Sequence, residues 1–266
     1  MIENNRPYTL AIRTDEFPNY FKEFITLSGI AVVNKLPRKY RYYEALNYYD
    51  SHKYSDWNKL DIPPFVVDAM SELCNFVALK ELMLKGSKGK PIKLLQKSNL
   101  IGPFCAEAMI VLHYVHRGYH VSWPSVFNLD PPDIIVRDLT NNFAVDIEVK
   151  TKEERGSVET MFDSFSRGLQ SLKKRRRVNG MAVIAIHNSD DLGWVDWLKD
   201  AAVLTRLESR LRTKDFSIVS GVIFSGGSVI KEEGNSSKHG TKLVAFRSNA
   251  AANPLPLGFL TQSANI

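Results

Sequence analysis

The fold is decided by the stretch NLDPPDIIVRDLTNNFAVDIEVKTKEE, residues 128–154. Two of its segments, 132–138 and 142–150, are rich in Val, Ile and Phe, which favour strands. The residues between them, Leu-Thr-Asn-Asn, are typical of a turn. The stretch therefore predicts a β-hairpin.

The hairpin carries acids and a lysine at regular spacing. Side chains alternate along a strand, so Asp146, Glu148 and Lys150 share one face. Alternation alone would explain Asp146 as a solvated residue of a half-buried strand. Asp133 is different, because it opens the apolar run 134–136, and so apolar a strand is usually covered on both faces. An acid at its entrance lies near the core, where ionisation needs a compensating charge.

A further carboxylate stands in the helix predicted over 104–118. Between Phe104 and Tyr114 the only acidic or basic residue, histidine aside, is Glu107. Two interpretations stay open on burial preferences alone. Glu107 lies either at the solvent edge of the helix or inside, held by a partner.

The elements downstream of Pro103 follow a regular order. We expect the helix 104–118, a short strand over 119–126, the two hairpin strands, a helix over 157–177, a strand over 180–188, a helix over 192–212, a strand over 216–227 and an edge strand over 241–248. This order predicts an α/β fold with a mixed central sheet flanked by helices on both faces.

The first part of the chain has another character. Residues 65–86 have apolar side chains at helical spacing, and the glycine- and lysine-bearing segment 86–99 indicates a flexible basic connector. We therefore divide the chain into a mostly helical, aromatic-rich accessory or substrate-binding region, 1–95, and a larger domain, 96–266, which contains the hairpin.

The segment 35–57 interleaves tyrosines with arginines and lysines. Such tyrosines can stack on bases while the cations hold phosphates. Alternatively, the rings pack the N-terminal region against the core with their hydroxyls at the surface. We favour packing, because no known nucleic-acid-binding motif is present.

The composition sets the broad class. The 266 residues can bury a sizeable core, and a formal net charge of +6 with a pI near 9.2 favours polyanionic partners. Cys74 and Cys105 are too few for a disulfide framework, which indicates a reducing compartment. No signal-peptide pattern and no apolar run of about 18 residues occurs, so we expect a cytoplasmic protein with no membrane partner.

Glu107 on a helix, Pro132-Asp133 opening one strand and Glu148-Val149-Lys150 on the next together resemble the PD-(D/E)xK nuclease superfamily. The resemblance covers about half the chain and implies the restriction-endonuclease-like core, with the element order αβββαβαβ. It also implies a Mg²⁺ site, in which Mn²⁺ can substitute.

The resemblance implies a role for each site residue. Asp133 and Glu148 would bind the metal through their side chains and Val149 through its carbonyl, while Lys150 would orient the attacking water or stabilise charge on the phosphate. Glu107 would complete the metal shell or support a second ion. Asp146 departs from the minimal pattern. It is a candidate for an outer acid, but we favour a solvated strand residue.

The helix 157–177 ends in a cationic run. In the superfamily the corresponding helix often places a polar side chain near the active site, and here the candidate is Gln170. The run Lys173, Lys174, Arg175, Arg176 and Arg177 could bind phosphates. It could equally be a helix C-terminus, whose dipole favours cations.

The expected function is a metal-dependent nuclease, a DNA endonuclease of restriction, defence or mobile-element type. Two alternatives stay open: a catalytically silent nucleic-acid-binding or assembly protein on the same fold, and an RNA-cutting toxin or defence nuclease. With one site per chain, cutting both strands of a duplex calls for a homodimer, two successive events or a partner protein in a larger complex.

Overall fold

The computed structural model describes residues 3–4, 8–30, 41–90, 92–96, 98–127, 132–152, 157–174, 180–188, 198, 200–231, 236–256 and 258–260. Within these residues, eight strands form one sheet in the order β1-β8-β7-β6-β5-β4-β3, with β2 also paired to β8. The strands are β1 (Glu3–Asn4), β2 (Tyr8–Arg13), β3 (His120–Ser122), β4 (Ile134–Asp138), β5 (Phe143–Lys152), β6 (Met181–Asn188), β7 (Gly221–Lys231) and β8 (Ser236–Arg247). β5, β6 and β7 are parallel and their outer neighbours antiparallel, so the predicted mixed sheet is confirmed.

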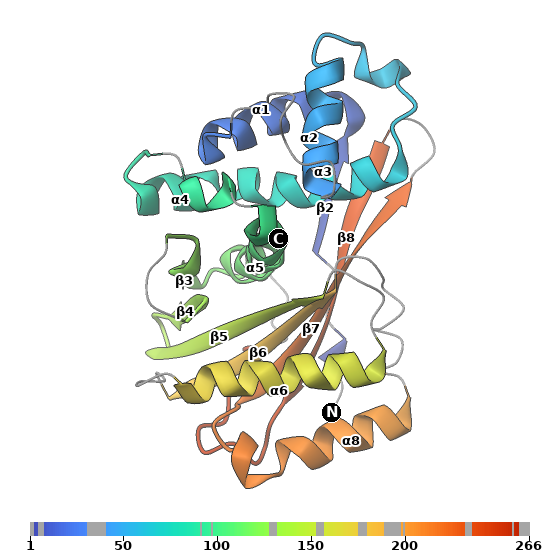
Figure 1. Ribbon diagram of the computed structural model, residues 1–266. Helices are drawn as coiled ribbons and strands as arrows, with labels where there is room; N and C mark the ends of the chain where they lie inside the picture. Colours follow the sequence, from blue (N-terminus) through green and yellow to red (C-terminus); the bar gives the residue numbers. More distant parts are fainter. Residues whose placement is uncertain are drawn as a thin grey trace.

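Helices cover both faces of this sheet, as Figure 1 shows. They are α1 (Phe17–Ser28), α2 (Arg41–His52), α3 (Pro64–Ala78), α4 (Lys80–Ser87), α5 (Ser98–His116), α6 (Val158–Lys174) and α8 (Ala201–Leu211). None of the helices in the described ranges is both long and apolar enough to cross a membrane.

Strand β5 separates two hydrophobic cores. Its residues Val145, Ile147 and Val149 belong to the core shared with α1, α3 and α5. The opposite face of the sheet packs against α6 and α8, through residues such as Ile184 of β6. Asp146, Glu148 and Lys150 therefore face the α6 side, as alternation predicted.

The last strand is not at an edge. We expected an edge strand over 241–248, but β8 has β7 on one side and β1 and β2 on the other. The expectation was wrong because the short segment 8–13 was not recognised as a strand. Its partner lies almost at the other end of the chain.

Other boundaries also differ from expectation: α5 starts before the predicted helix 104–118, and β7 and β8 are displaced from the predicted strands 216–227 and 241–248. The helix predicted over 65–86 is broken at Leu79, where the backbone leaves the helical range and α4 begins anew. The strand predicted over 119–126 is shorter, ending at Ser122, and a single 3-10 turn, η4 (Ser125–Phe127), follows it. The proline at 124 has no N–H for a ladder and accounts for this end.

The described part of the tyrosine-rich segment, from residue 41 onward, packs as favoured, and residues 35–40 lie outside the described residues. The rings of Tyr42 and Tyr43 in α2 are buried, whereas Tyr54 is 93% exposed. The expectation that the hydroxyls lie at the surface was wrong for Tyr42, which donates a 2.5 Å hydrogen bond to the buried Glu72 of α3.

The N-terminal region is joined to the rest of the chain in two ways. It supplies β1 and β2 to the common sheet, and its helices α1 and α3 share one hydrophobic core with α5. In the predicted connector, Ile92 and Leu95 are buried in that same core. The boundary between 95 and 96 stays a prediction.

Candidate active site

The hairpin places Asp133 beside Glu148. Strands β4 and β5 are antiparallel with Ile134 opposite Ile147, so Asp133, which immediately precedes β4, lies near Glu148 and Val149 of β5. The Val149 N–H donates a 2.8 Å hydrogen bond to Oδ2 of Asp133. Because the N–H and C=O of one strand residue point to the same side, the Val149 carbonyl also faces Asp133.

Lys150 forms an ion pair with Glu148. Its Nζ lies 2.5 Å from Glu148 Oε1, and the two side chains are 24% and 6% exposed. Burial lowers the pKa of Lys150, the charges of Asp133 and Glu107 oppose that change, and the nearby charge of Arg167 adds to it. These charges therefore form one cluster, drawn from a hairpin and two helices.

Glu107 lies inside and has partners, which settles the interpretation left open above. It is 6% exposed, and its Oε2 accepts a 2.5 Å hydrogen bond from Trp123 Nε1 and another from the Ser125 hydroxyl. Burial, with the charge of Asp133 second, raises the pKa of Glu107 to about 8. Glu107 is therefore mostly protonated at neutral pH.

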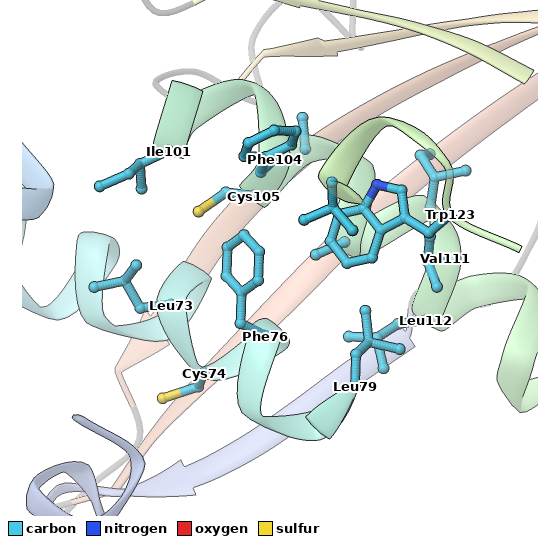
Figure 2. Close-up of a cluster of buried hydrophobic side chains, with 14 of the residues drawn as sticks. Leu73, Cys74, Phe76, Leu79, Ile101, Phe104, Cys105, Val111, Leu112 and Trp123 are labelled. Atoms are coloured by element: carbon cyan, nitrogen blue, oxygen red, sulfur yellow. The ribbon is translucent and has the colours of Figure 1, made fainter. Parts of the chain in front are cut away.

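Trp123 is held by helices from both parts of the chain, as Figure 2 shows. Its indole stacks on Phe76 of α3 with ring centres 5.8 Å apart, and meets the edge of Phe104 of α5 at 6.5 Å. A buried indole needs an acceptor for its N–H, and Glu107 supplies it. Helix α3 of the N-terminal region thus helps to orient a predicted site residue.

Asp146 is not the solvated residue that we favoured. It is fully buried, between Ile135 of β4 and Ala182 of β6. The prediction was wrong because alternation defines two faces of a strand without saying which of them another element covers, and here the α6 layer covers the face that carries Asp146.

The candidates on α6 differ in their surroundings. Gln170 and Lys174 are exposed on the helix surface, while Lys173 forms a 2.7 Å ion pair with Asp215. The candidates Arg175, Arg176 and Arg177 lie outside the described residues. Whether this run contacts phosphate stays a prediction.

Arg167 is a residue that the sequence reasoning missed. The glycine after it, Gly168, packs so closely on Ile184 that a Cβ there would lie 2.6 Å from the Ile184 side chain. Ile184 is in register with Glu148, so α6 approaches the sheet at the level of the site. In the described part of the chain no carboxylate pairs with Arg167, which donates instead to Ser164. A glycine within an amphipathic helix was the signal for this close approach.

The groups available to bind a metal are few, and all of them are oxygen donors. Among the described residues no three His, Cys, Asp or Glu side chains gather as a metal-binding group. Two carboxylates, Asp133 and Glu148, and the Val149 carbonyl do face one place. Mg²⁺ is often bound by one or two carboxylates and keeps several waters, so this donor set fits it.

The site is distinct from the hollow of about 500 Å³ lined by Arg117 and the turn residues Asp138–Asn141. That hollow lies at the turn of the hairpin, at the other end of β4 from Asp133. Its polar groups are largely engaged, since Asp138 binds the turn and Arg117 donates to the carbonyls of Gly258 and Phe259.

Comparisons with known protein families, with curated proteins and with solved structures found no match to this chain. Its function must therefore be argued from the site itself. The site offers two carboxylates, a carbonyl and a lysine where β4 begins beside β5, and the charges of Glu107 and Arg167 act on its lysine.

Proposed function

We propose that the protein is a Mg²⁺-dependent nuclease that hydrolyses phosphodiester bonds, with DNA as its substrate. The observation that carries the proposal is the hairpin pairing, which sets Asp133 beside Glu148 and Lys150 next to both. This is an arrangement suited to a hard divalent cation and an anionic reaction centre. The restriction-endonuclease-like core is part of the same proposal.

Three groups of the hairpin would bind the metal ion. Asp133, Glu148 and the Val149 carbonyl would hold Mg²⁺, which, when bound, polarises a phosphate oxygen and acidifies a coordinated water. The hydrogen bond from the Val149 N–H fixes the Asp133 carboxylate in its orientation before any ligand arrives. Such preorganisation lowers the cost of assembling the site during the reaction.

Lys150 has two successive roles in this proposal. Without a cation, its ammonium compensates the buried Glu148 carboxylate. With a cation at Asp133 and Glu148, the Lys150 ammonium would no longer be needed for that compensation and could hold the attacking water or the phosphate. Arg167, a planar donor without a carboxylate partner in the described ranges, lies near enough to act on the charge of Lys150 and would suit a phosphate oxygen.

The test is nicking of supercoiled plasmid by the purified protein with Mg²⁺ or Mn²⁺, and EDTA as the control. Asp133→Asn and Glu148→Gln should lose cleavage and metal binding together while the fold persists. Lys150→Ala should lose cleavage by about 10²-fold or more and bind Mg²⁺ at least as tightly as the parent. Asp163→Asn, an exposed acid of α6, is the matched control and should cleave normally.

A survey of labelled DNA and RNA of defined structure then identifies the substrate. Cleavage confined to RNA would replace DNA in the proposal and leave the site unchanged. Tight binding of several nucleic acids with no cleavage in either metal would contradict catalysis and favour the silent binding protein.

A further inference from the structure

The end of helix α4 is connected to the candidate site through the turn η4. The ring of Phe127 packs directly on Gly86, so closely that any side chain at 86 would collide with it. Phe127 belongs to the same single turn, η4, as Ser125, whose hydroxyl binds Glu107. Two contacts therefore connect the end of α4 with the buried acid of the site.

This end of α4 carries exposed lysines, Lys85, Lys88 and Lys90, which we call the α4 lysine surface. In the described part of the chain no carboxylate pairs with any of them. Lys80, at the start of the same helix, does have a partner, Glu23, at 3.3 Å. The positive charge is therefore uncompensated only at the end of α4 that approaches the site.

Helix capping does not account for all of this surface. Cations in the last turn of a helix are stabilised by its dipole, which explains Lys85. Lys88 and Lys90 lie beyond the last helical residue, Ser87. Moreover, Lys88 has a left-handed backbone, with φ of 53°, where glycine or asparagine is less strained. A lysine at this position indicates a use for its charge.

We propose that the α4 lysine surface binds backbone phosphates of the nucleic acid whose scissile bond lies at Asp133 and Glu148. The inference rests on the proposed function and extends it, because it makes the N-terminal region part of the substrate-binding surface. Lysine ammonium groups act as point charges on phosphates. The contacts are therefore independent of base sequence and weaken as salt rises.

Binding of a labelled DNA duplex, measured in EDTA over a range of salt, tests the inference. Lys88→Gln with Lys90→Gln should lower the affinity by about tenfold or more at low salt, and flatten the slope of log affinity against log salt by nearly two. Arg212→Gln with Lys214→Gln removes the same charge from exposed residues after α8, and should change affinity little. Equal losses in the two pairs would overturn the inference.

A crosslinking experiment gives a second readout that does not depend on affinity. Lys88→Cys can be labelled with a photoactivatable reagent, since the native Cys74 and Cys105 are buried. The labelled variant should crosslink to the duplex, and Arg212→Cys treated in the same way should not. Absence of a crosslink at 88, with binding intact, would contradict the proposed contact.

These results separate the inference from the proposed function, because binding in EDTA requires no cleavage. If the parent binds DNA through these lysines but cleaves no substrate, the proposed nuclease activity is refuted and the proposed binding surface is retained. If the parent cleaves DNA and the Lys88→Gln, Lys90→Gln variant binds the duplex as tightly as the parent does, only the proposed role of the α4 lysine surface is refuted.

Discussion

Two buried glutamates, one in each part of the chain, have nearly the same local setting. Glu107 of α5 is 6% exposed and Glu72 of α3 is 2% exposed, and both helices are predominantly apolar. Each carboxylate accepts a 2.5 Å hydrogen bond from an aromatic side chain, Trp123 for Glu107 and Tyr42 for Glu72.

Their wider surroundings differ. The charges of Asp133 and Lys150, which come from the hairpin, act on Glu107, and the bond from Tyr42 to Glu72 joins α2 to α3 far from that hairpin in the sequence. Burial of an acid with a hydrogen-bond donor is thus compatible with a purely structural role. The convergence of further charges on the same place is what distinguishes a candidate site.

Cleavage provides the largest expected difference between the two acids. Glu107→Gln should lower the rate by more than about 10²-fold, because a cation held by Asp133 and Glu148 would lower the pKa of Glu107 and favour its anion, which an amide cannot supply. Glu72→Gln should stay within about twofold of the parent, since it lies outside the reaction centre. Single-turnover rates of nicking of supercoiled plasmid measure the effects of both substitutions. Equal losses would mean that the comparison does not separate function from structure.

The pH dependence of stability tests Glu107 without any substrate. Its folded-state pKa of about 8 exceeds the ordinary value of 4.5, so between these values the folded chain holds a proton that the unfolded chain has released. Stability should therefore fall as pH rises through this window, by about 1.4 kcal/mol per pH unit. Relative to the parent, Glu107→Gln should gain roughly 2–3 kcal/mol between about pH 6 and pH 8, in urea unfolding with EDTA. If the unfolding free energies of the parent and of Glu107→Gln changed in parallel with pH, Glu107 would be ionised in the folded protein.

Tyr42→Phe tests how much the hydrogen bond to Glu72 contributes to stability. The substitution leaves Glu72 buried without the hydroxyl that binds it, which should cost about 1–3 kcal/mol of unfolding free energy. Cleavage should be unchanged. Tyr54→Phe, at a ring that is 93% exposed, is the control and should cost less than about 0.5 kcal/mol. A parent-like stability for Tyr42→Phe would remove the hydrogen bond from the account of the N-terminal region.

Lys88→Gly should have the smallest effect on the fold, and a favourable one. Glycine relieves the left-handed backbone at this position, which should raise the unfolding free energy by about 1 kcal/mol. The same variant should bind DNA less tightly. If Lys88→Gly is more stable than the parent and binds DNA equally well, Lys88 contributes neither to stability nor to binding. The N-terminal region would then have only its packing role.

Local patterns predicted much of the fold and part of the site. The period-two pattern of β5 correctly placed Glu148 and Lys150 on one face, and the apolar helix around Glu107 was correctly expected. What failed depends on residues far apart in the chain. Asp146 is buried because α6 covers its face, and Trp123 finds its acceptor 16 residues earlier, on α5.

The same reason explains the strands that were missed. The segment 8–13 is too short to identify itself by periodicity, and only its pairing with 236–241 makes it a strand. Arg167 was likewise invisible, because its position beside Lys150 depends on how closely Gly168 lets α6 approach β6.

The pairing of β2 with β8 has a consequence for biosynthesis. During translation the residues of β2 leave the ribosome early, and their partner strand follows only after nearly the whole chain has been made. Until then β2 has no strand to pair with, and this non-local contact must form late and slowly. A chain that stops short of Ser236 would display that strand permanently as an unpaired edge, the kind of surface on which incomplete proteins associate with one another.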